Sequence, residues 1–548
     1  MKIRYIEPKP RGATIYEIAN LPKLGLPLLA AIARNTYDDV DQHIYCELIR
    51  GVEVDWDDVL TADLVCISTT TNTTLEGYRY ADRCRAAGIP VLFGGSHVTF
   101  MAHEALQHAD YVIRREGHVG FAQFMEWLRG DRDPAGLHEI MGLSFIENGQ
   151  QVDNPEAPMA SGEDLDNLPF PALDLLEGHE RMVTHPIMMK WGCPYDCSFC
   201  SVIKMFGRKL RTRSVENMME ELRGVNPERV FFYDDIFIVD KKQAKSLFTA
   251  MIDEGITPQW TAQIRADSIY KSKQTLEPDH ELLALMRDSG CYMVYIGFES
   301  ITQEGLDAYN KKQKVEHITT SIKLLHDYGI RVHGMFVVGA DTDTPETVRA
   351  TVDFAIEHGV DTLQMMMLTT LPGTAFDAQM RAEGRVLTDD YSLYDGHHCI
   401  IQPKLMTPYE LQMETWKNML RFYSKKTPWE LGRKEIRANL WQFLRLLTEV
   451  KFMKNLPKAV RLWLTNRPSE SFKLIRTTIS RRGMRTIYET LGVAIFRAYG
   501  RKQLLKFTDQ PESMVHLDEI RRLPAWTPPN EPTDEVQGQE SPSLKVLS

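Results

Sequence analysis

The sequence predicts an α/β protein of several parts, in which two strand–helix regions precede a helical region. Strand-length apolar runs alternate with helix-type apolar spacing over about residues 1–145 and again over about 187–398, which is typical of parallel sheets covered by helices. From about residue 405 the apolar spacing is helical. With 43% hydrophobic and 25% charged residues, the composition is that of a globular chain and excludes a largely disordered or fibrous one.

The composition also limits where the protein works. No apolar run approaches the roughly 18 residues of a membrane-spanning helix, and residues 1–7 lack the long apolar core of a secretory signal. Eight cysteines are too few for a disulfide scaffold in a chain of 548 residues. A formal net charge of −11 argues against a nucleic-acid coat. We therefore expect a reduced, cytoplasmic protein.

The first strand–helix region predicts a doubly wound parallel sheet, whose ligands sit at the carboxyl ends of the strands. Two polar loops follow strands there. Gly94, Gly95, Ser96 and Thr99 follow the strand 91–93, and Glu116 with Gly117 follows the strand 111–113. The glycines allow close approach of a ligand and the hydroxyl groups offer hydrogen bonds. A bare tight turn is the competing interpretation of the glycine pair.

Three cysteines, Cys193, Cys197 and Cys200, give the strongest signal in the chain. Their spacing of four and three residues allows three thiolates to face one centre, and soft thiolates select iron–sulfur clusters or zinc. Structural zinc needs a fourth ligand, and neither His185 nor the distant Cys291 is an obvious one. Three thiolates on a four-iron cluster would leave one iron open to a small molecule.

The second strand–helix region carries charged residues where its strands end. Predicted strands over 230–233, 259–263 and 293–296 lead into Asp234 and Asp235, Arg265, and Glu299, respectively. In barrels, such strand-end residues face the site. Capping of the following helices is a competing interpretation, which is stronger for Asp341 and Asp343 than for Glu299.

The cysteine triplet and the aromatic Phe199 resemble the signature of the radical S-adenosylmethionine (SAM) superfamily. The resemblance implies a partial (β/α)6 barrel, and a [4Fe–4S] cluster that chelates SAM and yields a 5′-deoxyadenosyl radical. It also implies SAM contacts. Asp234 and Asp235 stand where the family usually has Gly-Gly-Glu, Glu299 fits the ribose or methionine position, and the segment from Gly334 to Gly339 matches the strand beside adenine. We add Arg265 as a cofactor-binding candidate.

The first region, with its 91–99 run, residues 110–113 and Glu116-Gly117, resembles the cobalamin-binding domain fused to many radical SAM enzymes. The resemblance implies that Gly94, Gly95, Ser96, Thr99, Glu116 and Gly117 contact cobalamin. The Asp-x-His-x-x-Gly motif that supplies an axial histidine is absent, so the resemblance implies either cobalamin bound without a histidine ligand from that motif or a domain that has lost the cofactor. His97 and His103 are conceivable ligands, but a surface or packing role is favoured for each of them.

The predicted domains are a cobalamin-binding domain over 1–149, an extended proline-rich linker over 150–184, a barrel over 185–404, a basic helical domain over 405–510 and a disordered tail over 511–548. About 20 Lys and Arg against about five Asp and Glu lie within 425–506. Basic amphipathic helices of this type are candidates for contact with an anionic membrane, and a solvated helical domain with a basic face is the competing interpretation. Cys399, near the end of the barrel, is the candidate catalytic thiol.

The leading hypothesis is a cobalamin-dependent radical SAM methyltransferase that acts on an unactivated carbon of a hydrophobic substrate, such as a lipid of the hopanoid kind. The alternatives are a cyclase or rearrangement enzyme of the anaerobic porphyrin cyclase kind, and a non-catalytic sensor that binds nucleic acid. A reducing partner such as ferredoxin or flavodoxin is expected. The expected location is cytoplasmic, with peripheral contact at the inner membrane face. Nucleic acid is a disfavoured partner, because no binding module is recognisable.

Overall fold

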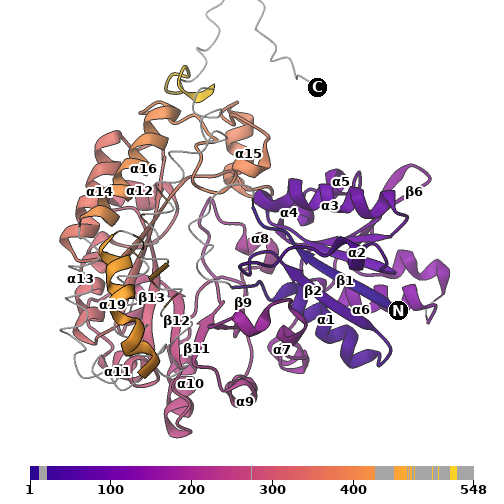
Figure 1. Ribbon diagram of the computed structural model, residues 1–548. Coiled ribbons are helices and arrows are strands. Elements are labelled where there is room, and N and C mark those ends of the chain that lie inside the picture. The colour runs from indigo at the N-terminus through magenta and orange to yellow at the C-terminus, as the bar shows by residue number, and fades with distance from the viewer. Residues whose placement is uncertain are drawn as a thin grey trace, which may run out of the picture.

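The computed structural model contains two α/β bodies side by side, each built on a parallel sheet (Figure 1). It describes residues 1–10, 21–131, 133–272, 274–425, 450–465 and 519–527, together with 467, 470, 471, 474, 497, 501 and 504. Among these residues, no helix is long and apolar enough to cross a membrane.

The first sheet has seven strands in the order β2-β1-β3-β4-β5-β6-β7, of which the first five run parallel. Helices cover both faces, because one core joins the sheet to α1 and α6 and a second core joins it to α2, α3, α4 and α5. Burial on both faces explains the nearly continuous apolar strands. This confirms the doubly wound sheet. Its elements are β1 (Lys2–Glu7), α1 (Gly25–Thr36), β2 (Asp41–Cys46), α2 (Trp56–Val59), β3 (Leu64–Ser68), α3 (Thr74–Ala86), β4 (Val91–Gly94), α4 (Ser96–Phe100), α5 (Ala102–Ala105), β5 (Tyr111–Ile113), α6 (Gly117–Arg129), β6 (Leu143–Glu147) and β7 (Gln150–Asp153).

The predicted extended linker over 150–184 is wrong in part. Its first residues form β7, which pairs antiparallel with β6 and extends the first sheet. The hairpin turns at Asn148 and Gly149, which both have positive φ (51° and 77°), and Asn-Gly is the preferred pair for such two-residue turns. Further along, Ser161 caps the short helix α7 (Gly162–Asn167). We therefore call residues 1–153 the first domain.

The second sheet has six parallel strands in the order β15-β14-β13-β12-β11-β8, with helices packed on its outer face. The predicted partial (β/α)6 barrel is thereby confirmed. Its strands are β8 (His185–Ile187), β11 (Arg229–Phe232), β12 (Gln259–Ile264), β13 (Cys291–Glu299), β14 (Arg331–Val338) and β15 (Thr362–Met367). The helices are α9 (Val215–Val225), α10 (Lys241–Asp253), α11 (His280–Asp288), α12 (Gln303–Ala308), α13 (Val315–Asp327), α14 (Pro345–Glu357) and α15 (Ala375–Ala382).

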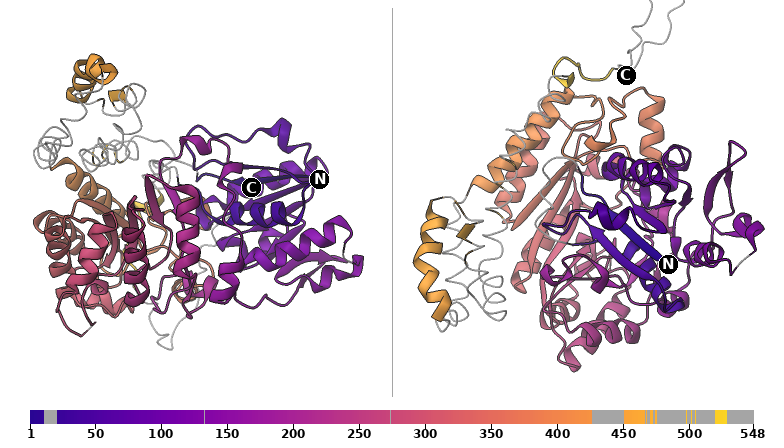
Figure 2. Two further views of the ribbon diagram at one scale, coloured as in Figure 1. Left: turned by 90° about the horizontal axis from the view of Figure 1, so that it is seen from below. Right: turned by 45° about the vertical axis from the view of Figure 1, so that its right-hand side comes forward.

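Beyond the barrel, α16 (Pro408–Ser424) begins at a capping box between Thr407 and Glu410 and packs on α14 and β15. The helix α19 (Val450–Leu464) lies on the side of the barrel away from the first domain in both views of Figure 2. Two stretches with helical apolar spacing in the predicted basic domain, 440–450 and 487–499, fall outside the described residues except for residues 450 and 497.

The predicted disordered tail over 511–548 is wrong for residues 519–527. Ile520 is buried in the barrel core. The Trp526 backbone N–H donates to the Pro403 carbonyl at 2.7 Å, and the Gln402 side chain donates to the Pro524 carbonyl at 2.8 Å. These apolar and backbone contacts fix the segment, although it is rich in proline. The rest of the predicted tail lies outside the described residues.

Candidate cofactor site

The three predicted metal-binding cysteines lie in one loop, residues 192–210, which we call the cysteine loop. Two short strands close its base, because β9 (Lys190–Trp191) pairs antiparallel with β10 (Arg211–Thr212). Gly192 has φ of +90°, and a Cβ there would lie 2.6 Å from the Lys209 carbonyl oxygen, so only glycine fits. The Cys193 N–H donates to the Gly207 carbonyl at 3.2 Å. The loop is therefore a closed excursion that ends in α8 (Val202–Phe206) and returns to β10.

The three thiols are close enough to influence one another electrostatically. Burial raises the pKa of each thiol, that of Cys200 to about 12, and neighbouring thiols add to the rise for Cys193 and Cys200. Among the described residues, no three His, Cys, Asp or Glu side chains converge on the position of a single metal ion. Three neighbouring sulfur donors are the ligand chemistry of an iron–sulfur cluster, whose positive iron ions replace the thiol protons.

Positive charges next to the cysteine loop favour the thiolate form. Lys311 lowers the pKa of Cys193 and Cys197 against the effect of burial, and Arg265 does the same for Cys197. The Lys311 ammonium donates to Glu299 at 2.6 Å, with both side chains largely buried. Sequence reasoning missed Lys311, because it lies in a loop after α12 with no motif around it.

Arg265, Phe199 and Glu299, which the sequence also predicted as cofactor-binding residues, make different contacts. Arg265 makes a two-bond ion pair with Asp267 and stacks 4.0 Å from the centre of the Tyr195 ring, so it supports the cysteine loop from behind. Phe199 packs edge-on against Tyr309 at 5.4 Å between ring centroids. Glu299 holds a left-handed backbone, with φ of +61°, at the end of β13.

The two adjacent aspartates differ in their surroundings. Asp234 is fully buried and accepts a hydrogen bond from the Met189 N–H at 3.1 Å, so it ties β11 to the strand that leads into the cysteine loop. Asp235 lines the cavity described below. Burial raises the pKa of Asp234 to about 6 and that of Asp235 to about 7, where the neighbouring Asp234 adds to the rise. Of the pair, Asp235 is the one that lines the cavity.

Gly334 and Cys399 lie in packed surroundings. A Cβ on Gly334 would contact Val360, Phe336 and Phe298, so this glycine serves the packing of β14. The Cys399 thiol is fully buried, donates to the Ile401 carbonyl at 3.2 Å and has a pKa raised to about 12 by burial. These surroundings give Cys399 no access to a substrate and do not support a catalytic role.

Gly339 lies just beyond the end of β14 and has φ of +101°. Its N–H donates to Asp343 at 2.8 Å, and the Asp343 side chain also accepts from the Ala340 N–H at 3.0 Å. The carboxylate therefore stabilises this turn. Gly339 allows the left-handed backbone that the turn requires.

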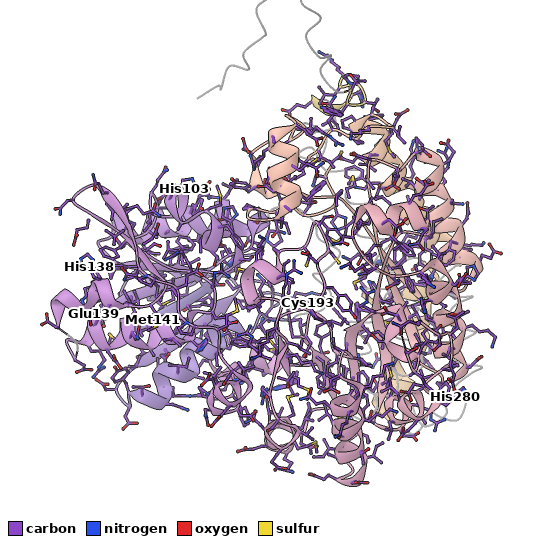
Figure 3. All side chains as sticks on the ribbon, turned by 180° about the vertical axis from the view of Figure 1, so that it is seen from behind. His103, His138, Glu139, Met141, Cys193 and His280 are labelled. Atoms are coloured by element: carbon purple, nitrogen blue, oxygen red, sulfur yellow. The ribbon has the colours of Figure 1, made fainter. Side chains whose placement is uncertain are left out.

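A cavity of about 470 Å³ lies between the first domain and the barrel. The first domain contributes the carboxyl ends of β3, β4 and β5, at residues 68–70, 94–96 and 115–118. Residues 23–26, 28 and 29 around the start of α1, the segment 168–171 and the barrel also line the cavity. The barrel residues include Met188, Trp191, Ser201, Val202, Met205, Phe206, Tyr233 and Asp235. The cavity thus reaches from the predicted cobalamin loops to the helix that directly follows Cys200. Figure 3 shows Cys193 on the side of the barrel that faces the first domain.

Of the predicted cobalamin contacts, Gly94, Gly95, Ser96, Glu116 and Gly117 line this cavity, and Thr99 does not. The Thr99 hydroxyl donates to the Gly95 carbonyl at 2.9 Å and accepts from the Arg115 N–H at 2.9 Å, so it joins the two loops from behind.

His97 and His103 do not line the cavity. His97 is buried and packs edge-on against Tyr391 at 4.6 Å between ring centroids, in agreement with the packing role favoured for it. His103 is exposed and lies at the top of the first domain in Figure 3.

The residues of the cavity fit cobalamin. A Cβ on Gly94 would meet only the Ile113 carbonyl, at 3.9 Å, so the glycine leaves open space against the strand ends. His118, which also lines the cavity, has a buried Nδ1 with no hydrogen-bond partner among the described residues. Burial lowers the pKa of His118, so its imidazole is neutral and offers a lone pair to a ligand.

Comparisons with known proteins agree with this geometry. Residues 191–355 match the Radical SAM superfamily and residues 18–125 match the B12 binding domain. An uncharacterised methyltransferase of Pyrococcus horikoshii is 28% identical over 77% of this chain and 92% of its own length. The hopanoid C-3 methylase of Methylococcus capsulatus is 26% identical over 84% of this chain and 87% of its own length. The anaerobic magnesium-protoporphyrin IX monomethyl ester cyclase of Cereibacter sphaeroides is 28% identical over 62% of this chain and 56% of its own length.

Solved structures show the same fold. The cobalamin-dependent SAM radical enzyme OxsB with aqua-cobalamin and SAM bound superimposes with a TM-score of 0.63 at 15% identity, over 95% of this chain and 83% of that one. The fold and site define a radical SAM enzyme. Residues 18–125 form a B12-binding domain and residues 191–355 a radical SAM domain, and the cofactors of these domains are a [4Fe–4S] cluster, SAM and cobalamin.

We predict that Gly95→Ala weakens cobalamin binding and destabilises the first domain. Gly95 has φ of +106°, and a Cβ there would lie 2.3 Å from the Thr69 carbonyl oxygen, so the loop must move at a cost of about 1–3 kcal/mol in the free energy of unfolding. Urea unfolding and absorbance titration with hydroxocobalamin measure the two effects. Gly88→Ala is the control, because Gly88 has φ of +78° with nothing within 4 Å. Equal effects of the two substitutions on cobalamin affinity would contradict the prediction.

Proposed function

We propose that the protein is a cobalamin-dependent methyltransferase that adds a methyl group to an unactivated carbon of a hydrophobic substrate. The observation that carries the proposal is the shared cavity, which joins the cobalamin-facing strand ends to the cysteine loop. When bound, the cluster supplies the electron that cleaves SAM, and cobalamin carries the methyl group. The names of the methyltransferase and hopanoid methylase relatives support this reaction type.

The roles of individual residues follow from their positions. Cys193, Cys197 and Cys200 hold the cluster, and Lys311 stabilises the negative charge of Cys193 and Cys197. Asp235 and Glu299 orient SAM, since both lie electrostatically close to the cysteine thiols. Gly94, Gly95, Ser96, Gly117 and His118 contact cobalamin. A reduced ferredoxin or flavodoxin supplies the electron.

The lumen of the barrel supports a hydrophobic substrate. The Phe231 ring from β11 packs edge-on against Tyr233 at 5.3 Å and against Tyr295 of β13 at 5.7 Å. Since β12 separates β11 from β13 in the sheet, this contact shows that the rings meet inside the curved sheet. Tyr295 in turn lies 4.5 Å from His333 of β14. Tyr233 also lines the cavity, so the lumen and the cobalamin cavity adjoin.

These lumen side chains are uncharged at neutral pH. Burial lowers the pKa of His333 to about 4 and raises that of Tyr295 to about 12. The pKa of Tyr233 is likewise raised by burial. An aromatic, neutral lumen favours an apolar substrate over an anionic one, because a buried charge would find no counter-ion among these side chains.

We predict that anaerobically reconstituted, reduced protein cleaves SAM and that its product carries one added CH₂ unit by mass. Cys197→Ala abolishes the cluster absorbance and SAM cleavage, because two thiolates do not retain the cluster, and leaves the far-UV circular dichroism unchanged. Cys84→Ala, which removes a buried thiol of the first domain, is the control and keeps the cluster. Turnover by Cys197→Ala would contradict the cluster assignment. A product that has lost hydrogens without gaining carbon would favour the cyclase, and absence of SAM cleavage in the reconstituted protein would favour the sensor.

We further propose that α19 contacts an anionic membrane surface, which would bring the enzyme to a lipid substrate. Lys454, Lys458 and Arg461 are exposed on this helix. Val460 and Leu464 are 39% and 61% exposed beside them. Exposed apolar side chains together with cations are typical of helices that lie in a membrane interface.

Vesicle co-sedimentation tests this contact. We expect binding to vesicles that contain anionic phospholipid, weaker binding at high salt, and at least a several-fold loss of binding in Lys454→Glu/Lys458→Glu, because each basic residue contributes about 1 kcal/mol near such a surface. Lys323→Glu, on the exposed face of α13, is the matched control. Equal binding to neutral vesicles, or no effect of the double substitution, would contradict the proposal.

A further inference from the structure

Residues 115–118, which we call the docking loop, follow β5 at the edge of the cavity and include the first two residues of α6. All four residues line the cavity. Arg115 has a left-handed backbone, with φ of +59°, and its N–H donates to the Thr99 hydroxyl. This conformation is costly for a residue other than glycine, and such strain persists where the surroundings fix it.

Three side chains of the docking loop contact the barrel. The Arg115 guanidinium donates to the Lys204 carbonyl at 2.6 Å. The Glu116 carboxylate forms an ion pair with Arg211 at 2.5 Å, with both side chains 4% exposed. The His118 ring packs edge-on against Trp191 at 5.8 Å between ring centroids. Each side chain that faces the cavity from this loop therefore also contacts the other domain.

The three barrel partners frame the cysteine loop. Trp191 and Arg211 form its closed base, where β9 pairs with β10. Lys204 lies in α8, the helix that follows Cys200. Arg211 also donates to the Phe206 carbonyl at 2.7 Å, at the end of the same helix. The docking loop thus contacts both the base of the cysteine loop and its final helix.

The Glu116–Arg211 pair also fixes the chain between the domains. The Ala160 N–H donates to Glu116 at 3.1 Å, and Arg211 donates to the Ala160 carbonyl at 3.1 Å. One linker residue is therefore held by both members of a buried pair. Removing one member leaves the other charge buried without a counter-ion, so the pair holds one arrangement of the two domains strongly.

We propose that the docking loop is a positioning element that couples occupation of the cobalamin cavity to the geometry of the cysteine loop. A ligand that orders the loop from the cavity side also orders the partners that frame the cluster ligands. By linkage, the cluster must then tighten cobalamin binding by the same factor by which cobalamin favours the cluster. Glu116, expected from the sequence to contact cobalamin, acts through Arg211. The inference rests on the proposed use of the cavity by cobalamin.

Absorbance titration with hydroxocobalamin tests this coupling in full-length protein with and without a reconstituted cluster. We expect the cluster to tighten cobalamin binding of the unchanged protein at least about 5-fold, the lower end of typical couplings. In Glu116→Gln, which keeps the shape of the side chain but removes its charge, the ratio of the two dissociation constants falls to near one. Arg211→Lys keeps the charge but loses the second donor, and gives an intermediate ratio.

Asp39→Asn is the matched control, because Asp39 pairs with Arg129 within the first domain and is exposed. This variant keeps the full ratio. Thermal unfolding of each variant, with and without the cluster, shows whether the variant folds. If Glu116→Gln does not fold, Arg211→Lys provides the test of the coupling. A wild-type ratio in folded Glu116→Gln overturns the coupling and leaves the proposed function intact. Absence of cobalamin binding by the unchanged protein overturns both.

Discussion

Two parallel sheets direct their carboxyl ends at one cavity, and the rest of the structure depends on this arrangement. In each sheet, the strand ends supply the loops that can contact a ligand. The glycine loop after β4 and the docking loop after β5 face the cavity from one side, and α8 and Asp235 face it from the other. Two cofactor sites on one chain become a single reaction site only because their domains are held in this orientation.

The surroundings of the cysteine loop are charged, whereas the adjoining barrel lumen is neutral. Around the cysteine loop, Lys311 and Arg265 oppose the burial that would keep the thiols protonated. In the lumen, burial keeps His333 and Tyr295 neutral. Charge is therefore concentrated where a cluster and SAM must be held. The adjoining lumen presents neutral aromatic surface, which suits a substrate without charge and excludes water from it.

Local patterns predicted most of the parallel strands of both sheets and the cysteine triplet, because each is encoded by residues near one another in the chain, but they missed the antiparallel strands β6 and β7. The Asn148-Gly149 turn was also readable from sequence, although we assigned the residues after it to the linker. Long-range pairings carry no local signal. Glu116 meets Arg211 and Lys311 meets Glu299 only after folding. A sequence pattern likewise could not show that Asp235 lines the cavity while its neighbour Asp234 is buried against backbone.

The central claim is that cobalamin and the cluster occupy adjoining sites in one cavity. Electron paramagnetic resonance of protein that carries both cob(II)alamin and the reduced cluster tests it most directly, because two nearby unpaired spins split and broaden each other's signals. We expect the doubly loaded protein to show such an interaction, absent from protein loaded with either group alone. A spectrum equal to the sum of the two separate spectra would contradict the account.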